Sequence, residues 1–146
     1  MKRNFLFILV ALLITTLPSC KHHDDPGIDY SGFLNCTNSH PMDSSSTARQ
    51  LVGEWQMDQN FCETSGLNVY DVKLSFDSIG NFIEFDQGSP YVTCKWSLSA
   101  IDSVTFQLKL TVPSQYTYGT ILLCSNSILF LDSPSDGCDN EFSRVQ

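Results

Sequence analysis

The second half of the chain is a series of short runs in which apolar and polar residues alternate. The most regular run is Val104–Leu110, where every second residue is apolar. Because successive side chains of a strand point to opposite faces, this alternation predicts strands with one buried face. No segment from residue 50 onward has a helical period over eleven or more residues. We therefore predict strands over residues 51–57, 70–77, 82–85, 91–98, 104–111, 116–124, 127–131 and 141–145.

The connections between these runs are short and rich in turn-forming residues. Eight short strands with such connections are typical of an antiparallel meander. If eight strands close, both sheet edges disappear, and the interior is filled by side chains or holds one small ligand. We predict an all-β fold, an eight-stranded antiparallel meander barrel. An immunoglobulin-like β-sandwich is the second choice. In that fold the core Trp lies about midway between two Cys, whereas here Trp96 is only two residues after Cys94.

The N-terminus has the parts of an export signal. Lys2 and Arg3 precede an apolar run over residues 5–14, which is too short to span a bilayer as a permanent helix. The run ends in Leu17-Pro18-Ser19-Cys20, which resembles the lipobox of bacterial lipoproteins. This resemblance implies a signal peptide over residues 1–19, a lipidated Cys20 and an anchor in the outer membrane, on its periplasmic or cell-surface side. Several acyl chains on one Cys give stable anchoring.

Charge restricts the partners of the mature chain. Cleavage before Cys20 leaves 127 of the 146 residues, enough for one modest domain, and removes two basic residues, so that the formal net charge falls from −8 to −10. An acidic surface repels phosphate backbones and anionic lipid headgroups. We therefore expect no nucleic-acid partner, and we expect membrane contact through the N-terminal lipid.

Residues 20–49 are predicted to be a flexible tether between the lipid and the barrel. Residues 35–50 are rich in Asn, Ser and Thr, a composition that buries little apolar surface. Residues 27–34 are more apolar and could dock on the folded domain, where Cys36 could pin them. The runs at 121–123 and 128–131 are apolar on both faces, so their outer face needs a cover or forms a binding patch. We predict that Ile28–Leu34 covers it.

Several short pieces from residue 50 onward are similar, in their order and spacing, to the lipocalin-like domains of small bacterial lipoproteins. These pieces are Leu51–Trp55, Leu74–Phe76 with Gly80–Phe82, Trp96–Leu98, Ile128–Leu131 and Phe142–Arg144. The resemblance implies a lipocalin-like β-barrel over residues 50–146, a group in which most members have no assigned function. Within such a barrel Trp55 can lie across the closed end, with Gly53 leaving room for a neighbouring group. The candidates for core or ligand-lining residues are Trp55, Tyr70, Leu74, Phe76, Trp96, Phe106, Leu108 and Leu129.

Six Cys in an exported chain indicate an oxidising compartment. If Cys20 carries lipid, five remain, so at least one is free or pairs with another chain, and two bridges allow fifteen patterns. If the meander closes, the first and last strands pair, and Cys62 and Cys138 lie at the same end of the barrel. We predict this disulfide first. Cys94 and Cys124 are separated by one strand, beyond the reach of a bridge along the sheet, and are interpreted as small core residues. The alternative is a flattened barrel in which the two form a bridge across the interior.

The sequence lacks the common catalytic patterns. It has no nucleophile elbow, phosphate-binding Gly loop, zinc-protease helix or Cys-x-x-Cys, and no His between residues 50 and 146. Glu84 and Asp86 are interpreted as solvated residues at a strand end. His22, His23 and His40 lie in the predicted tether without a rigid scaffold for a metal. We therefore predict a non-enzymatic protein with no cofactor and no metal site.

One further motif concerns modification. Ser78 and Ser103 each follow an Asp and precede an apolar residue, and this pattern resembles the O-glycosylation acceptors of some bacteria that are rich in surface lipoproteins. Asp-Ser is also a common turn former, so both Ser side chains are expected in turns.

Two functions remain open on this basis. The first is a lipid-anchored envelope lipoprotein whose barrel binds a small apolar ligand. The second is a protein-interaction or surface-scaffold module with a filled barrel, which would use an outer patch or the acidic loop at residues 132–139. An interior volume below that of a small ligand would favour the second.

Overall fold

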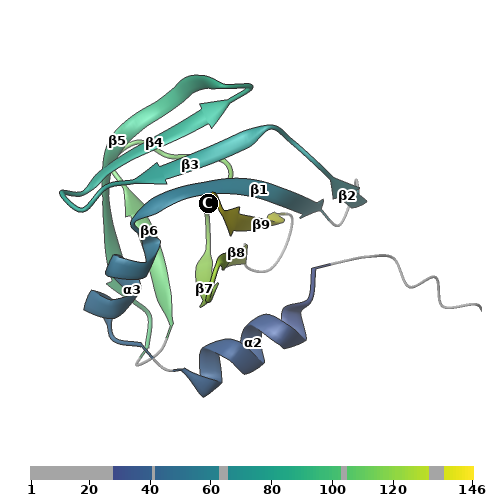
Figure 1. Ribbon diagram of the computed structural model, residues 1–146, viewed down its shortest axis with the longest axis vertical. Helices are drawn as coiled ribbons and strands as arrows, with labels where there is room; N and C mark the ends of the chain where they lie inside the picture. The colour runs from purple at the N-terminus through teal and green to yellow at the C-terminus, as the bar shows by residue number, and fades with distance from the viewer. Residues whose placement is uncertain (1–27, 41, 63–65, 103–104, 132–136) are drawn as a thin grey trace, which may run out of the picture.

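The computed structural model of the protein describes residues 28–40, 42–62, 66–102, 105–131 and 137–146. These residues form two short helices and one antiparallel sheet (Figure 1). The helices are α2 (Tyr30–Ser39) and α3 (Ser44–Leu51). The strands are β1 (Gly53–Cys62), β2 (Gly66–Asn68), β3 (Val72–Phe76), β4 (Asn81–Asp86), β5 (Ser89–Ala100), β6 (Phe106–Leu110), β7 (Thr120–Cys124), β8 (Ser127–Leu131) and β9 (Cys138–Arg144).

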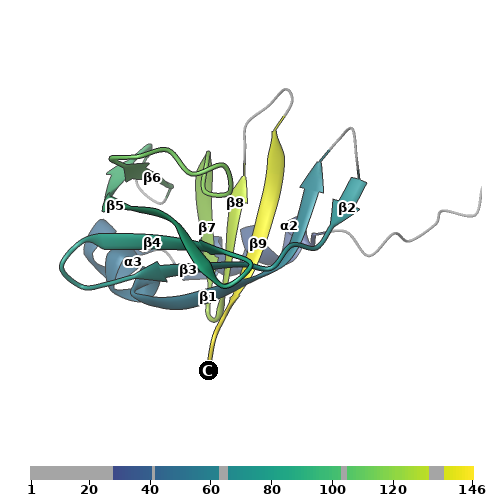
Figure 2. The ribbon, with the colours of Figure 1, turned by 90° about the horizontal axis from the view of Figure 1, so that it is seen from above.

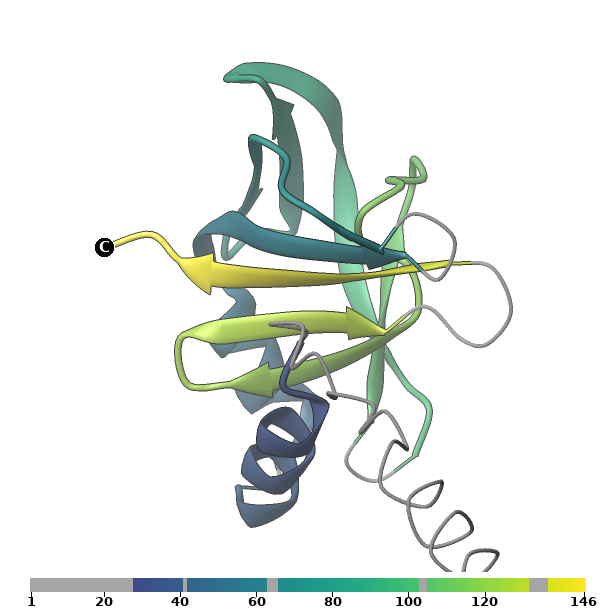
Figure 3. The same ribbon diagram turned by 90° about the vertical axis from the view of Figure 1, so that its right-hand side faces the viewer.

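The sheet closes into a barrel. From β3 to β9 each strand pairs with the next along the chain, and β9 returns to pair with β1 from Trp55–Arg144 to Cys62–Cys138. Figure 3 shows β9 lying between β1 and β8. The short strand β2 pairs only with the last residues of β1 and lies outside this circuit. The prediction of an all-β, eight-stranded antiparallel meander barrel is confirmed, and the immunoglobulin-like sandwich is wrong because one continuous sheet closes on itself.

Local turn chemistry explains the meander. In the β3–β4 turn the Asp77 carboxylate accepts hydrogen bonds from the backbone N–H groups of Ile79 at 3.0 Å and Asn81 at 2.7 Å. Gly80 has a φ of 82°, which a residue without Cβ adopts at little cost. The turn therefore reverses the chain within four residues and directs β4 back along β3.

Alternation along the strands places one apolar face inside the barrel. The core unites residues from every strand of the circuit, and its fully buried members include five large aromatic side chains. These five are Trp55, Phe76, Phe82, Phe130 and Phe142. Burial of a large apolar side chain contributes roughly 1.5–3 kcal/mol. These aromatic side chains therefore fill much of the apolar core and stabilise the barrel.

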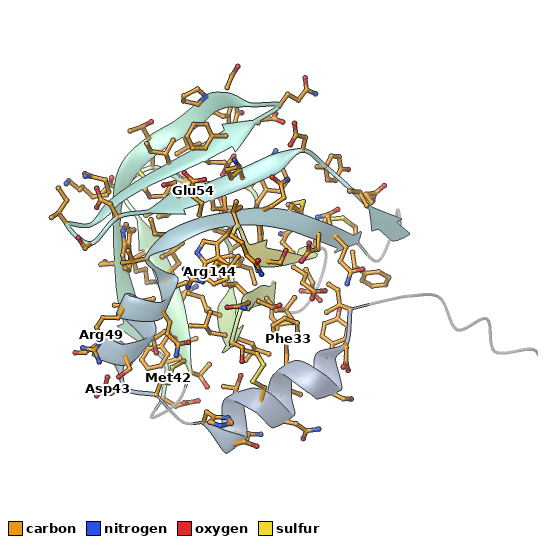
Figure 4. All side chains as sticks on the ribbon, in the orientation of Figure 1. Phe33, Met42, Asp43, Arg49, Glu54 and Arg144 are labelled. Carbon is orange, nitrogen blue, oxygen red and sulfur yellow. A yellow bond between two sulfur atoms is a disulfide. The ribbon has the colours of Figure 1, made fainter. Side chains whose placement is uncertain are left out.

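Trp55 is completely buried at the end of the barrel that carries α3. Its indole Nε1–H donates to the carbonyl oxygen of Leu51 at 2.8 Å, which ties the start of β1 to the end of α3. The Arg144 guanidinium lies 4.1 Å from the centroid of the Trp55 ring and donates to the carbonyl oxygen of Val52 at 2.9 Å (Figure 4). A Cβ at Gly53 would meet this guanidinium, so Gly53 makes room for Arg144.

The two helices correct the predicted flexible tether over the part of residues 20–49 that the structure describes. Asp29 and Asp43 cap them, since their carboxylates accept from Gly32 N–H at 2.9 Å and Ser46 N–H at 2.7 Å. The hydroxyl of Thr37 donates to the carbonyl oxygen of Phe33, four residues earlier. Polar side chains that the composition analysis counted against order are thus satisfied within the helix.

Helix α2 covers the outer face of β7 and β8, where the strands are apolar on both sides (Figure 1). Ile28 and Phe33 pack there against Leu122 and Leu129 in a second apolar cluster. Figure 4 shows Phe33 on the side of α2 that faces the strands. The predicted cover is confirmed.

Candidate binding site at the open end of the barrel

The two ends of the barrel differ in chemistry. We call the end that carries the connections 69–71, 87–88 and 111–119 the open end, and the end that carries α3 the closed end. Six polar or charged side chains are buried in the described residues, and only Thr47 of α3 belongs to the closed end. The other five are Asn60, Glu84, Ser114, Thr117 and Asn140. The interior is therefore apolar toward the closed end and partly polar toward the open end.

On one side of the open end, β1 and β9 present an amide pair. Asn60 and Asn140 face each other in the ladder, and the Asn60 side chain donates to Asn140 Oδ1 at 2.6 Å. The Asn140 amide donates to the carbonyl oxygen of Cys138 at 3.0 Å. Two residues farther out, Cys62 and Cys138 form a disulfide with a Cα–Cα distance of 4.2 Å. The predicted pair is confirmed, and the disulfide holds the rim of β1 against β9.

On the other side, β4 places a carboxyl group inside the barrel. Glu84 pairs with Leu74 of β3 and Val92 of β5, and its side chain is completely buried. Neither carboxylate oxygen has a hydrogen-bond partner among the described residues. Burial raises the pKa of Glu84. The Ser114 hydroxyl is close enough to lower this pKa, although its geometry is not that of an ordinary hydrogen bond, and the charge of Asp86 raises it further.

This position corrects the interpretation of Glu84 as a solvated residue. Along β4, Phe82 and Glu84 share one face, while Ile83 and Phe85 share the other. Both faces contain apolar residues, so the segment alone does not reveal which one is inside. The pairing with β3 decides which face is inside. Phe82 and Glu84 lie opposite the buried Phe76 and Leu74, so they point to the same interior side of the sheet. No signal within the segment marks the buried carboxyl.

The connection 111–119 folds over the open end (Figure 2). Its Ser114 and Thr117 side chains are buried, and the half-buried Tyr116 packs against the core. The ring centroid of Tyr116 lies 6.2 Å from that of Tyr70. Burial is the main cause that raises the pKa of Tyr116, and the charges of Asp86 and Glu84 add to it. The cluster therefore combines side chains from the 69–71 connection, from β4 and from the 111–119 connection.

A gap in the barrel wall lies beside this cluster. β6 and β7 pair only through Phe106–Ile121 and Gln107–Thr120, whereas β5–β6 and β7–β8 each pair over five residues. Next to the gap is a cavity of about 220 Å³ between β6 and the 111–119 connection. Its lining includes Leu108, Leu110, Ser114 and Thr117. The cavity thus combines apolar wall residues with the buried hydroxyls of the connection.

A second hollow lies on the outer surface of β1, β3 and β4. Its volume is about 460 Å³, and its lining includes Glu54, Gln56, Lys73 and Phe85, which point away from the core. The Lys73 ammonium and the Glu54 carboxylate form an ion pair at 3.7 Å. The lining is mostly polar, and this surface is separate from the interior.

Most predicted core residues are where the sequence analysis expects them. Trp55, Leu74, Phe76 and Leu108 are buried in the core, Phe106 is buried, and Trp96 packs against the core while partly exposed. Two are wrong. Tyr70 is 44% exposed and lies in the connection before β3. Leu129 faces outward against α2, because Ile128 and Phe130 are the residues of β8 that face inward.

The remaining Cys residues give a mixed result. Cys124 is not a core residue, because it forms a disulfide with Cys36 of α2. It ends β7 next to the surface that α2 covers, and the expectation that Cys36 pins this segment is confirmed. Cys94 forms no disulfide and lies half-buried against the core.

Some predicted sites fall outside the described residues, among them Cys20 and Ser103. Ser78 is exposed in the β3–β4 turn, and His40 is exposed after α2. In the described part of the chain, no three His, Cys, Asp or Glu side chains gather as metal ligands. Neither of the described helices is long and apolar enough to cross a membrane.

No protein-family model, curated protein or solved structure matches the chain. The function is therefore considered from the geometry of the open end.

Proposed function

We propose that the protein is a non-enzymatic, lipid-anchored lipoprotein of the cell envelope, and that its lipocalin-like barrel binds a small, mainly apolar molecule at the open end. The lipobox-like sequence before Cys20 supports the anchor. The gap between β6 and β7 carries the binding part of the proposal, because it gives a solvent route to a cavity whose wall includes Leu108 and Leu110. Concave sites with apolar walls and a few polar groups are typical of small-molecule binding.

The size of the cavity limits the ligand. Sites for drug-sized molecules are on the order of 300–1,000 Å³. The cavity at the open end, at about 220 Å³, is smaller than these. The filled aromatic core leaves the apolar half of the barrel occupied by its own side chains. We therefore expect a compact ligand rather than a long lipid.

Native mass spectrometry of residues 21–146, secreted to the periplasm without the lipid, tests the proposal. We expect a bound mass that denaturation releases. In the variant Thr117→Phe, a larger side chain occupies the cavity, and the bound mass should disappear. Thr93→Phe is the matched control, since Thr93 is exposed on β5. Retention of the same adduct by Thr117→Phe would contradict binding at the open end.

The alternative function is a protein-interaction or surface-scaffold module. The outer hollow across β1, β3 and β4 favours it, because it is larger than the cavity at the open end and lies on the accessible face of the sheet. A bare monomer in every native spectrum would favour this alternative. Part of the acidic loop at residues 132–139 lies outside the described residues, so the alternative rests on the hollow.

A further inference from the structure

The buried carboxyl group of Glu84 lacks a partner within the described protein. Its side chain is completely buried, and both oxygens are without a hydrogen bond. Buried polar groups in native proteins nearly always have partners, and an ionised group without one is costly. Its two neighbours in the ladder, Leu74 and Val92, are apolar, and Trp55 lies beyond Leu74. Glu84 is therefore an unusual residue for a position that only fills the core.

The five Lys and Arg residues that the structure describes all have other partners, although Lys109 and its partner Gln107 also line the cavity beside β6. Lys73 pairs with Glu54 on the outer surface. Lys95 donates to Asn81, Lys109 donates to Gln107, and Arg49 donates to Ser46. Arg144 lies over Trp55 at the closed end. None of these described cations supplies a counter-charge to Glu84.

The groups that do face Glu84 favour a positive charge. Asp86, two residues along the same strand, adds a second carboxylate at the rim. Tyr116 lies close enough to both acids for their charges to raise its pKa, and its ring centroid lies 6.2 Å from that of Tyr70. The negative faces of aromatic rings attract ammonium groups, with a contribution of about 0.5–2 kcal/mol. Ser114 provides a hydroxyl that can either donate or accept.

We propose that Glu84 recognises the protonated amine of a ligand whose small apolar body occupies the cavity beside β6. Ser114 lines this cavity and lies next to Glu84, so its side chain would move aside for the ammonium group. The ammonium group would then donate hydrogen bonds to the two Glu84 oxygens, close to Asp86 and Tyr116. The apolar body would contact Leu108 and Leu110. This inference rests on the proposed function, since it names the ligand class of the same open-end site.

Three probes with one carbon skeleton test the charge requirement. Cyclohexylamine is a cation at pH 7, cyclohexanol is neutral, and cyclohexanecarboxylate is an anion. Isothermal titration of residues 21–146 should show at least tenfold tighter binding of cyclohexylamine than of cyclohexanol, and the weakest binding for the carboxylate. Cyclohexanol binding as tightly as the amine would overturn the inference but leave the proposed function intact. Absence of binding by all three probes would overturn both.

Two variants assign the preference to Glu84. Glu84→Gln keeps the size of the side chain and removes its charge, so the preference for the amine over the alcohol should fall below about threefold. Glu54→Gln removes a carboxylate from the outer surface and should keep the full preference. If Glu84→Gln does not fold, Asp86→Asn is the second variant, and it should weaken amine binding severalfold without changing cyclohexanol binding. Unchanged amine preference in a folded Glu84→Gln protein would overturn the proposal.

Discussion

Replacing Glu84 with Gln should stabilise the free protein at neutral pH. The wild-type carboxyl is completely buried without a hydrogen bond, and burial raises its pKa above the value in the unfolded chain. Between these two pKa values the native state holds more protons than the unfolded state, so the free energy of unfolding falls as pH rises. At low pH the group is protonated in both states, and this loss disappears.

The size of the effect follows from the missing partners. A buried polar group without a hydrogen bond costs about 1–3 kcal/mol, and more when it is charged. Gln also lacks partners at this position, so it removes the cost of the charge but not the cost of a buried polar group. We therefore expect a gain of about 1–3 kcal/mol for Glu84→Gln at pH 7, which for a domain near 100 residues raises Tm by several degrees. At pH 3.5 the two proteins should be equally stable.

Urea unfolding of residues 21–146 with the disulfides intact, at pH 3.5, 5 and 7, measures this difference. Glu54→Gln is the matched control at an exposed site, and its effect should stay within about 0.5 kcal/mol at each pH. A stability difference that does not change with pH would refute the reasoning. Lower stability of Glu84→Gln at pH 7 would also refute it, because it would mean that the native protein stabilises the charged carboxylate.

Three other substitutions test separate parts of the structure. Arg144→Met removes the cation over the Trp55 ring and the hydrogen bond to Val52, and urea unfolding should show a loss of about 1–3 kcal/mol. Replacing both Cys36 and Cys124 with Ser should speed hydrogen exchange in α2 and increase the binding of an apolar dye at the face that α2 covers, while exchange in β1 and β9 stays slow. Cys20→Ala should move the protein from the membrane fraction to the soluble fraction, and retention in the membrane would contradict the lipid anchor.

The barrel could be predicted from sequence because alternation is a local signal. Phe106 and Leu108 alternate with polar residues, which identifies a strand with one buried face. Such a strand pairs with the next strand of the chain when a short turn connects the two. The meander follows from short connections, and closure follows from the need to pair the edges. The Cys62–Cys138 pair is then a consequence of topology, since β1 and β9 must meet.

The parts that sequence did not reveal depend on distant contacts. Residues of α2 are mostly polar, and their helix is stabilised by a cap at Asp29 and by packing of Phe33 on strands almost 90 residues later. Glu84 and Leu129 lie in segments whose two faces are both apolar, so only pairing with neighbouring strands decides which face is inside. The buried carboxyl was therefore the least predictable feature of the candidate site.

The disulfide between Cys36 and Cys124 also limits how far the barrel can stand from the membrane. If Cys20 is lipidated, a free chain up to Gln50 would allow a separation of about 100 Å at 3.3–3.6 Å per residue. Because α2 is bonded to β7 and Ile28 is buried against β7 and β8, the distance from Cys20 to Ile28 sets the limit, and eight residues span at most about 29 Å. The barrel would then remain close to the bilayer, with its α2 side nearest the lipid, and a ligand or partner would have to reach the open end within that narrow layer.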